Sequence, residues 1–573
     1  MASSVKLSGT TTSALEPITS RLSIIQSKAT EKREIDPRRA KDEEELLKEI
    51  GYKQELHRTF STFQTFGIAF SIMGLLPSIA TCMGTGLYTG ASGLVWGWFV
   101  SGIFILSIGV GMSELCSSIP TSGGLYYWTN YYSPDSIRVP LSFVIGCSNS
   151  VALCAGVCSV DFGFAGELLS AVYISKDGDF DITVYNKYGI FAACLLAHVA
   201  LVTFSRGKTA AVQSVSSYAN IGICLLFFIA VPIGTKINMG GFNDGKFIFG
   251  DMENYGGWSN TGWEFCNGWM VCIWTIGGFD SCVHMSEEAN STGFSIPIGI
   301  IGSISICWIV GFFICITLGA CMSTDVDSVI DTGSGEAIAQ IIYDSLGKKW
   351  AVAFMSLICI CQFMMGASLL LAASRQIWAF SRDDGLPFAK YIKVVNKKYR
   401  QPLRATYFAG GLSLFICCLT LAGDTAADAL FSLAVAGNYL AWTTPIFLRL
   451  TVGREKFKPG AFYLGPIFSP IVNWIAVFWT AFVIILCMFP SSSSVTASTM
   501  NYTVVINPGV WVLSILFYFT YKYKYYHGPK SNLQDPTAED IAELERIKHQ
   551  KTKEVALVKV SSRDASSNSD SVV

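Results

Sequence analysis

Charged residues are scarce in this chain, and neither sign is in excess. Asp, Glu, Lys and Arg make up 14% of the 573 residues, and the formal net charge is −1. A protein that binds nucleic acid normally carries a surplus of Lys and Arg, so no nucleic-acid partner is expected. Apolar side chains make up 51% of the chain, and the mean hydropathy is +0.43. This composition is typical of an integral membrane protein.

The sequence also lacks the short motifs that accompany catalysis or metal binding. HExxH, GxSxG and P-loop patterns are absent, and no paired His/Asp constellation stands at a predicted helix end. A membrane enzyme is therefore the least favoured class, and no cofactor is expected. The 18 cysteines form no CxxC pair and no Cys/His metal spacing, and most stand singly in apolar runs, such as Cys154 and Cys315. We interpret them as small buried side chains, so no metal site is expected.

Twelve apolar runs of about 20 residues or more, the length that crosses a bilayer, follow one another along the chain. They cover residues 63–84, 92–116, 139–173, 188–206, 210–235, 263–289, 296–322, 350–380, 405–423, 427–450, 467–489 and 508–524. The third and eighth runs are long enough to tilt strongly or to extend beyond the lipid. Residues 1–60 and 527–573 are polar and are predicted to be tails that flank a twelve-helix domain at 61–526.

The charges of the short loops predict the orientation in the membrane. With the N-terminus inside, the cytoplasmic loops hold most of the loop Lys and Arg residues, including Arg138, Arg206 and Arg449. The positive-inside rule therefore predicts that both termini are cytoplasmic. The sequon Asn501-Tyr-Thr503 then falls outside and is a candidate glycosylation site, whereas Asn290-Ser-Thr292 falls inside. The plasma membrane and the vacuolar membrane fit equally, because no sorting signal is present.

Two of the apolar runs contain features that interrupt a helix. Gly277 and Gly278 are adjacent in the sixth run, and the first run carries Gly74 and Pro77 near its middle. Broken backbone at membrane depth is tolerated only where it is buried in protein or lines a cavity. Two broken segments five spans apart indicate a secondary transporter built from inverted repeats, with its binding site at the breaks. The bare carbonyls and N–H groups at such breaks provide one pole for a cation and one for an anion.

Three stretches at predicted helix ends resemble the signatures of the amino acid–polyamine–organocation superfamily. They are Ser113–Tyr127, Ser374–Pro387, and Glu287-Glu288 followed by Pro297. Four further phrases are similar to the amino acid/choline transporter family, in its fungal branch of choline and 4-aminobutyrate (GABA) permeases: Glu49–Leu56, Gly67–Pro77, Gly240–Gly245 and Phe431–Asn438. The resemblance covers about residues 46–529. It implies an all-α membrane protein of twelve helices, namely a LeuT-like 5+5 inverted repeat with broken helices one and six plus two extra helices.

The resemblance also implies where a zwitterionic substrate binds. The family's carboxylate site maps onto Ile72, Met73 and Gly74, and its ammonium site maps onto Thr275, Ile276 and Phe279. The same two breaks include Ser71, Gly277, Gly278 and Asp280. Polar residues within spans usually face the bundle interior, which adds Asn149, Gln362 and Asn438 to the predicted substrate site.

Several ionisable residues within the spans have two interpretations. Asp280 is either a partner for a substrate ammonium or an N-cap of the second half-helix, and we favour the cap because it requires only this position. His284 can titrate near neutral pH, but a neutral packed histidine is favoured, and His198 is expected to be structural. Asp161, toward the outer end of its span, is either an attractor for amines or a solvated acid.

A second group of residues is predicted to control gating or coupling. Asn220 stands where the resemblance places a lysine thought to replace a sodium ion in many relatives, and an amide cannot hold a proton there. This departure puts lysine-based coupling in doubt. The charged side chains near the inner ends of the spans form ion pairs of an inner gate or are plain helix-end charges. They are Glu114, Glu287, Glu288, Arg375 and Arg382.

The leading hypothesis is a symporter that imports GABA or a related ω-amino acid together with protons. Its expected partners are a small zwitterionic or cationic amine, protons and the lipid bilayer. Choline, a polyamine such as putrescine, or a vitamin precursor are alternative substrates. A nutrient sensor that keeps the transporter fold is a further alternative, although the modest, low-complexity tails favour transport.

Overall fold

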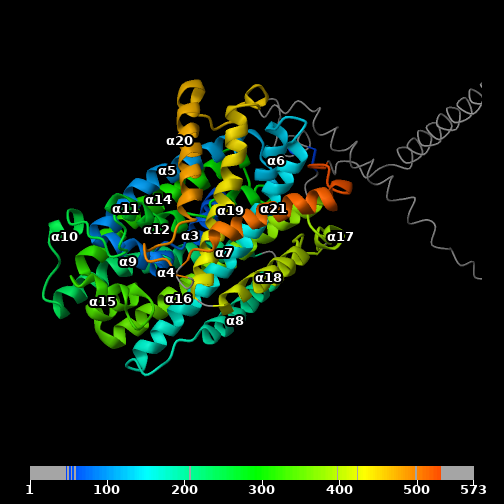
Figure 1. The fold of residues 1–573 in the computed structure, drawn as a ribbon. Coiled ribbons are helices and arrows are strands. Elements are labelled where there is room, and N and C mark those ends of the chain that lie inside the picture. The colour runs from blue at the N-terminus through cyan, green and yellow to red at the C-terminus, as the bar shows by residue number, and fades with distance from the viewer. Residues whose placement is uncertain are drawn as a thin grey trace, which may run out of the picture.

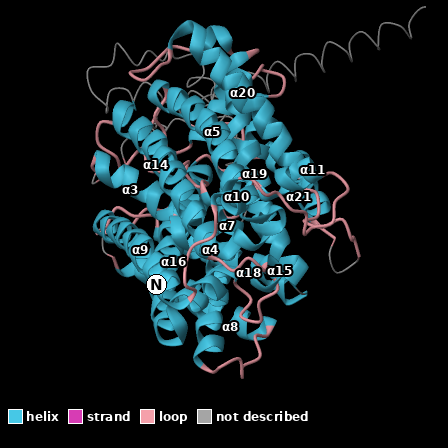
Figure 2. Ribbon diagram, turned by 90° about the vertical axis from the view of Figure 1, so that its left-hand side faces the viewer, coloured by secondary structure: helices cyan, strands magenta, loops and turns pink. Residues whose placement is uncertain are grey.

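Helices form all the regular secondary structure of the described chain. The computed structural model describes residues 47, 51, 52, 55, 56, 58, 60–205, 208–396, 398–422, 424–496 and 500–530. Within these residues no strand occurs, and β-pairing is limited to two isolated bridges, Phe60 with Ala289 and Asn396 with Gln401. Figure 2 shows the resulting bundle of helices joined by loops. Most of both predicted tails, and Arg206, lie outside the described residues.

The helices have the following bounds. The first part of the chain forms α3 (Thr62–Met73), α4 (Leu75–Gly86), η1 (Leu87–Thr89), α5 (Gly90–Ser118), α6 (Gly124–Tyr132), α7 (Arg138–Ser175), α8 (Val184–Phe204), α9 (Thr209–Asn238) and α10 (Gly245–Phe249). The middle forms α11 (Thr261–Gly268), α12 (Met270–Thr275), α13 (Ser281–His284), α14 (Thr292–Cys321), α15 (Val326–Ile330) and α16 (Ala337–Arg382). The last part forms α17 (Ala389–Ile392), α18 (Leu403–Cys417), η2 (Cys418–Ala422), α19 (Asp424–Leu450), η3 (Arg454–Lys456), α20 (Gly465–Leu486), α21 (Thr503–Thr520) and η4 (Lys522–Lys524).

Both predicted breaks are present. Gly74 separates α3 from α4 with a φ of +42°, in the left-handed region that favours glycine. The second break runs from the end of α12 at Thr275 to the start of α13 at Ser281, and Gly278 within it has a φ of +70°. Pro77 lies in the first turn of α4, where its missing N–H leaves no hydrogen bond unmade. Gly74 and Gly278 therefore mark the interruptions of the two helices, whereas Pro77 lies at the start of α4.

The two longest helices are those for which the apolar runs predict extra length. α7 has 38 residues, and α16 has 46. The φ of +73° at Gly347 divides α16, so the apolar run at 350–380 corresponds to the part after this kink. The part of α16 that precedes this kink lies outside the predicted apolar run.

Two pairs of long helices form the middle of the bundle. α5 packs along α14, and α7 packs along α16, as Figure 1 shows. In each pair one helix precedes the second break and the other follows it. The outer faces of the bundle are apolar, with exposed Phe468 and Phe478 on α20 and exposed Leu513 and Phe519 on α21.

Nine stretches within the described ranges are long and apolar enough to cross a membrane. They are Thr62–Ser118, Arg138–Ser175, Val184–Phe204, Thr209–Asn238, Thr292–Cys321, Ala337–Arg382, Leu403–Ala422, Gly465–Leu486 and Thr503–Thr520. The first of these contains α3, α4 and α5, so it comprises two of the predicted runs. Long helices with apolar exteriors are the arrangement that hydrocarbon requires, because each satisfies its backbone hydrogen bonds internally.

Candidate substrate site and its gates

A small cavity of about 40 Å³ lies between the two helix breaks. Its walls come from α3, α7, α12, the second break, α16 and α19. The lining residues are Ile72, Leu153, Gly156, Val160, Ile273, Trp274, Gly277, Gly278, Met365, Leu369, Ala434, Val435, Asn438, Tyr439 and Trp442. None of these residues is charged, so the charges of a bound molecule must be met by backbone groups and by a few polar side chains.

Four of the predicted substrate residues line this cavity, namely Ile72, Gly277, Gly278 and Asn438. The other predicted members of the breaks lie behind the wall: Ser71, Met73, Gly74, Thr275, Ile276, Phe279 and Asp280. The apolar lining from α7, α16 and α19 is absent from the sequence-based prediction. Its residues look like ordinary core residues in the sequence, and only the packing of three distant segments brings them to one cavity.

Each break interrupts the series of backbone hydrogen bonds of its helix. At the first break, Gly74 N–H donates to Phe70 O, in the last turn of α3, at 3.2 Å. The Ser78 hydroxyl donates to Met73 O at 2.6 Å and so closes the first break from the far side. At the second break, Ile276 N–H donates to Cys272 O, which is the last hydrogen bond of α12. The carbonyls of Ile273, Trp274 and Thr275, which follow Cys272, therefore have no intrahelical partner.

Asp280 occupies the N-cap position of α13, but its side chain does not cap the helix. The carboxylate instead accepts from Asn149 Nδ2 at 3.1 Å and lies 3.3 Å from His284 Nε2. Asn149 Nδ2 also donates to Asn438 Oδ1 at 3.0 Å. The favoured cap interpretation is thus wrong, because the carboxylate bonds to the Asn149 amide and makes no hydrogen bond to the backbone of α13. Asn149 lies behind the cavity wall and links Asp280 to Asn438, which does line the cavity.

Comparison with known proteins identifies the family of this chain. Residues 60–511 match the family described as Amino acid permease. This chain belongs to the amino acid permease family. It is 57% identical over 525 residues to the GABA-specific permease of Saccharomyces cerevisiae, with 91% of this chain and 92% of that protein covered. It is 33% identical to an uncharacterized amino-acid permease of Schizosaccharomyces pombe over 87% of this chain and 91% of that protein. It is 31% identical to Amino-acid permease BAT1 of Arabidopsis thaliana, which it covers to 96%, while 85% of this chain is aligned.

The permease is therefore a multi-pass membrane transporter and not an enzyme, as the sequence predicts.

The first break of the permease is joined to α9 and α16 by hydroxyl groups. Ser71 Oγ lies 2.5 Å from Ser216 Oγ and 2.7 Å from Ser368 Oγ, and the Ser368 hydroxyl donates to Gln213 Oε1 at 2.7 Å. Within the described chain, Ser71 thus serves to hold three helices together.

Two predicted functional amides have local structural partners instead. Asn220 Nδ2 donates to Ser216 O one turn earlier in α9, at 3.0 Å, so Ser216 and not Asn220 is the α9 residue that reaches the first break. Gln362 Nε2 donates to Val160 O at 3.1 Å and joins α16 to α7 without lining the cavity. The amide oxygens Asn220 Oδ1 and Gln362 Oε1 are buried without a hydrogen-bond partner in the part of the chain that the structure describes. The substrate role of Gln362 and the coupling role of Asn220 therefore stay predictions.

Buried ion pairs lie at the end of the bundle where the described parts of both tails lie, which we call the tail end. Arg382 Nη1 donates to both Glu287 carboxylate oxygens at 3.1 Å, and Arg375 Nε donates to Glu288 Oε1 at 2.7 Å. These two pairs join the chain after α13 to the end of α16. Four of the five predicted gate residues therefore pair as the gate hypothesis requires.

The fifth predicted gate residue, Glu114, belongs to a separate cluster. Arg449 Nη1 of α19 donates to Glu114 Oε2 at 2.5 Å, and Asn473 Nδ2 of α20 donates to the same oxygen at 3.0 Å. Glu114 is fully buried. It therefore fastens α5 to α19 and α20, and its placement with Glu287 and Glu288 is wrong, because its helix end meets a different neighbour.

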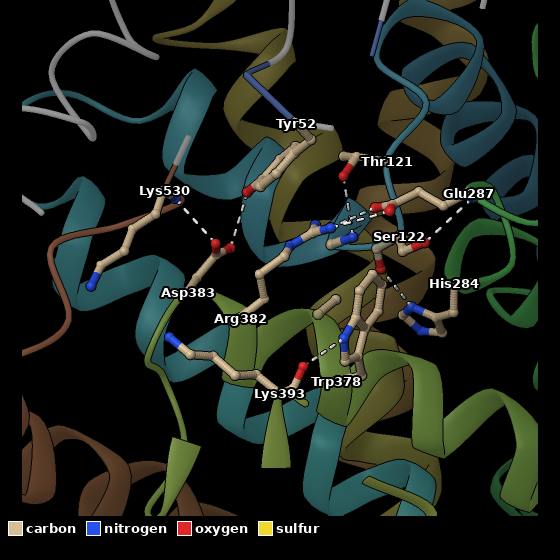
Figure 3. A network of polar contacts seen from close by, with 12 residues as sticks. Tyr52, Thr121, Ser122, His284, Glu287, Trp378, Arg382, Asp383, Lys393 and Lys530 are labelled. Carbon is tan, nitrogen blue, oxygen red and sulfur yellow. Dashed lines mark hydrogen bonds and ion pairs between the residues drawn. The ribbon is translucent and has the colours of Figure 1, made fainter. Parts of the chain in front are cut away.

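Residues of both tails contact Arg382 or its neighbour Asp383 (Figure 3). The Tyr52 hydroxyl donates to Asp383 Oδ2 at 3.0 Å, and the Arg382 guanidinium lies 3.9 Å from the centre of the Tyr52 ring. From the other terminus, Lys530 N–H donates to Asp383 Oδ1 at 3.1 Å. Burial raises the pKa of the Asp383 carboxyl, and the adjacent Arg382 opposes that shift. Tyr52 is fully buried, so packing extends beyond the predicted start of the transporter domain at residue 61.

The opposite end of the permease contains a larger cavity of about 130 Å³, which we call the vestibule. Trp274 and Val435 line both the vestibule and the central cavity. The rings of Trp274 and Phe431, which both line the vestibule, lie 4.8 Å apart between centroids. Asn501 also lines the vestibule, and its Nδ2 donates to the carbonyls of Cys487 and Phe489 at 2.8 Å. A glycan on this nitrogen would have to displace both hydrogen bonds.

Proposed function

We propose that this permease imports GABA or a related ω-amino acid across a membrane by alternating access, coupled to protons. The observation that supports this proposal most directly is an uncharged cavity between two broken helices. The relative that is 57% identical is named a GABA-specific permease, and the cavity chemistry supports the same class of substrate. On this proposal the tail end is cytoplasmic, in either the plasma membrane or the vacuolar membrane.

The uncharged lining favours a zwitterion over the alternative substrates. The N-terminal N–H groups of α4 and the C-terminal carbonyls of α12 carry partial charges of about +0.5 and −0.5 of an elementary charge. A carboxylate and an ammonium at opposite ends of one short chain fit such a pair of poles. Choline and putrescine lack a carboxylate, so either would leave the positive pole without a partner. The cavity of about 40 Å³ also requires widening before a longer polyamine enters.

We further propose that the helices form the twelve-span arrangement of two inverted five-helix repeats plus two. The pairings of α5 with α14 and of α7 with α16 support it, because they join equivalent members of the two repeats. In this arrangement the present structure is closed at the tail end by ion pairs. Toward the vestibule, the rings of Trp274 and Phe431 would form the corresponding barrier.

The experiment is uptake of labelled GABA into cells that lack their own permeases. Competition by unlabelled GABA, choline, putrescine and neutral amino acids is measured in parallel. We expect GABA and other ω-amino acids to compete at the lowest concentrations, and uptake to rise at acidic external pH, to fall with a protonophore and to be unaffected by removal of sodium. Stronger competition by choline or putrescine would overturn the substrate class. Binding without net uptake would instead support a sensor.

A further inference from the structure

A second acid–imidazole pair lies in the membrane-spanning part of the protein, away from the breaks. Asp161 of α7 and His198 of α8 are both fully buried, and each carboxylate oxygen lies 3.1 Å from His198 Nδ1. Each residue is 14 positions from the loop that joins α7 to α8, or about 21 Å along its helix. Asp161 is therefore not a solvated acid of the vestibule, and its pairing within the span departs from both sequence-based interpretations.

The pair adjoins the wall of the central cavity. The neighbour of Asp161 on α7 is Val160, which lines the cavity, and Met365 of α16 lines it from the other side. The next residue on α16, Gly366, has no side chain, and an added Cβ would collide with the Asp161 carboxylate and the His198 ring. Two of the helices in the cavity wall, α7 and α16, thus reach the pair one residue behind the lining.

The surroundings of the imidazole suit both of its protonation states. Nδ1 carries the proton that is donated to Asp161, so Nε2 is free to gain or lose one. Cys194 Sγ lies 3.7 Å from Nε2, and a thiol is both a weak donor and a weak acceptor. In the neutral ring the thiol donates to Nε2, and in the imidazolium Nε2–H donates to the sulfur. A structural histidine needs only one of these arrangements.

The same surroundings argue against a metal site and against an ion pair with a basic side chain. Asp161 contacts Nδ1 of the ring and Cys194 contacts Nε2, so in these side-chain positions the ring nitrogen beside one residue faces away from the other, although the ligand atoms lie within 4.8 Å of one another. Among the described residues, the other titratable groups that face the pair are the thiols Cys158 and Cys194, with Cys359 beyond Cys194. Phe363 packs on the ring with centroids 4.4 Å apart. No described Lys or Arg forms an ion pair with Asp161, so the protons on the pair alone set its charge.

We propose that Asp161 and His198 form the proton-binding site of the transport cycle, with Cys194 as the positioning residue for the imidazole. The inference rests on the proposed proton-coupled function. One proton added at Nε2 changes the net charge of the pair from −1 to 0, and the neutral state is the cheaper one in a low-dielectric interior. The pair therefore loads from the acidic side and unloads toward the cytoplasm, while α7 and α16 link its charge to the occupancy of the cavity.

The test compares gradient-driven accumulation with exchange in vesicles that contain the full chain. Labelled GABA accumulation under an imposed pH gradient depends on coupling, whereas counterflow at equal pH on both sides does not. We expect Asp161→Asn and His198→Gln to lose accumulation and the pH dependence of uptake, with counterflow within about threefold of wild type. The matched control is Asp177→Asn, an exposed acid near the end of the same helix, which should leave both measurements unchanged.

The thiol provides a test that does not depend on removing the pair. Because a charge-assisted hydrogen bond is stronger than a neutral one, Cys194→Ala should move the pH midpoint of uptake lower by about half a unit. Cys194→Ser, which retains a donor and acceptor, should restore it. These variants remain decisive if Asp161→Asn does not fold.

Each outcome separates this inference from the proposed function. A wild-type protein that transports GABA without responding to the pH gradient overturns proton coupling itself. A responsive wild type with an equally responsive Asp161→Asn overturns only the inference. Loss of accumulation and counterflow together in folded Asp161 and His198 variants, with no shift for Cys194→Ala, assigns the pair a structural role and also overturns it.

Discussion

Substitution of Gly278 is the sharpest test of the cavity, because the residue meets two separate constraints. Its φ of +70° is in the left-handed region, where a residue with a side chain costs about 1–2 kcal/mol. An added Cβ would also lie 2.5 Å from Ile72 Cγ2 across the cavity wall. Crowding of this kind costs about 1–3 kcal/mol. The two terms sum to about 2–5 kcal/mol for alanine.

Part of this cost falls on the binding site, since Gly278 and Ile72 both line the cavity. A loss of about 2–3 kcal/mol at the site corresponds to roughly 30- to 150-fold weaker uptake at low substrate concentration. We therefore expect Gly278→Ala to reduce uptake within this range. Gly278→Leu should abolish it, because the longer side chain occupies the space of the substrate. At Gly74 the nearest obstacle is the flexible Met365 thioether, 2.7 Å from an added Cβ, so Gly74→Ala should reduce uptake less.

The assay is initial uptake of labelled GABA, normalised to the amount of protein at the membrane, together with thermal unfolding of the purified protein. Gly222→Leu is the matched control, because Gly222 is exposed on α9 and an added Cβ meets no atom within 4 Å. It should transport normally. Normal uptake by a well-folded Gly278→Leu protein would refute the assignment of this break to the substrate site.

Three further predictions concern the polar clusters. Glu287→Gln leaves the Arg382 guanidinium buried without its carboxylate, at a cost of about 3–5 kcal/mol, so we expect unfolding at a lower temperature and partial recovery in the Glu287→Gln/Arg382→Gln double variant. Tyr52→Phe removes one hydrogen bond, worth about 1 kcal/mol, but keeps the ring on Arg382, so labelling of a cysteine introduced in the cavity from the tail-end side should rise less than in Tyr52→Ala. Asp280→Ser should transport no better than Asp280→Ala, because the carboxylate bonds to Asn149 and not to the backbone of α13.

The controls for these predictions use residues of the same kind elsewhere. Tyr185→Phe changes a tyrosine that is 78% exposed and should not alter labelling. An unchanged unfolding temperature for Glu287→Gln would show that the pair carries no net stabilisation. Equal labelling of Tyr52→Phe, Tyr52→Ala and wild type would remove the tail from the gate. Rescue of transport by Asp280→Ser would restore the cap interpretation.

The features that could be predicted from the sequence are those that depend on local chemistry. Apolar runs of membrane length located the helices, because hydrocarbon leaves the backbone no other way to satisfy its hydrogen bonds. Gly74 and Gly278 marked the breaks, because a left-handed backbone excludes most other residues. The motifs around Glu287 and Arg375 identified the family and the residues of two ion pairs.

The partner of each polar side chain could not be predicted, because it depends on how distant segments pack together. Asp280 turns to Asn149 and His284, Glu114 pairs with Arg449, and Asp161 pairs with His198. These partners lie far apart in the chain, except for His284, and a residue's polarity within a span indicates only that it avoids lipid. The cavity lining from α7, α16 and α19 was equally hidden, because apolar residues facing a substrate have the same local pattern as those facing another helix.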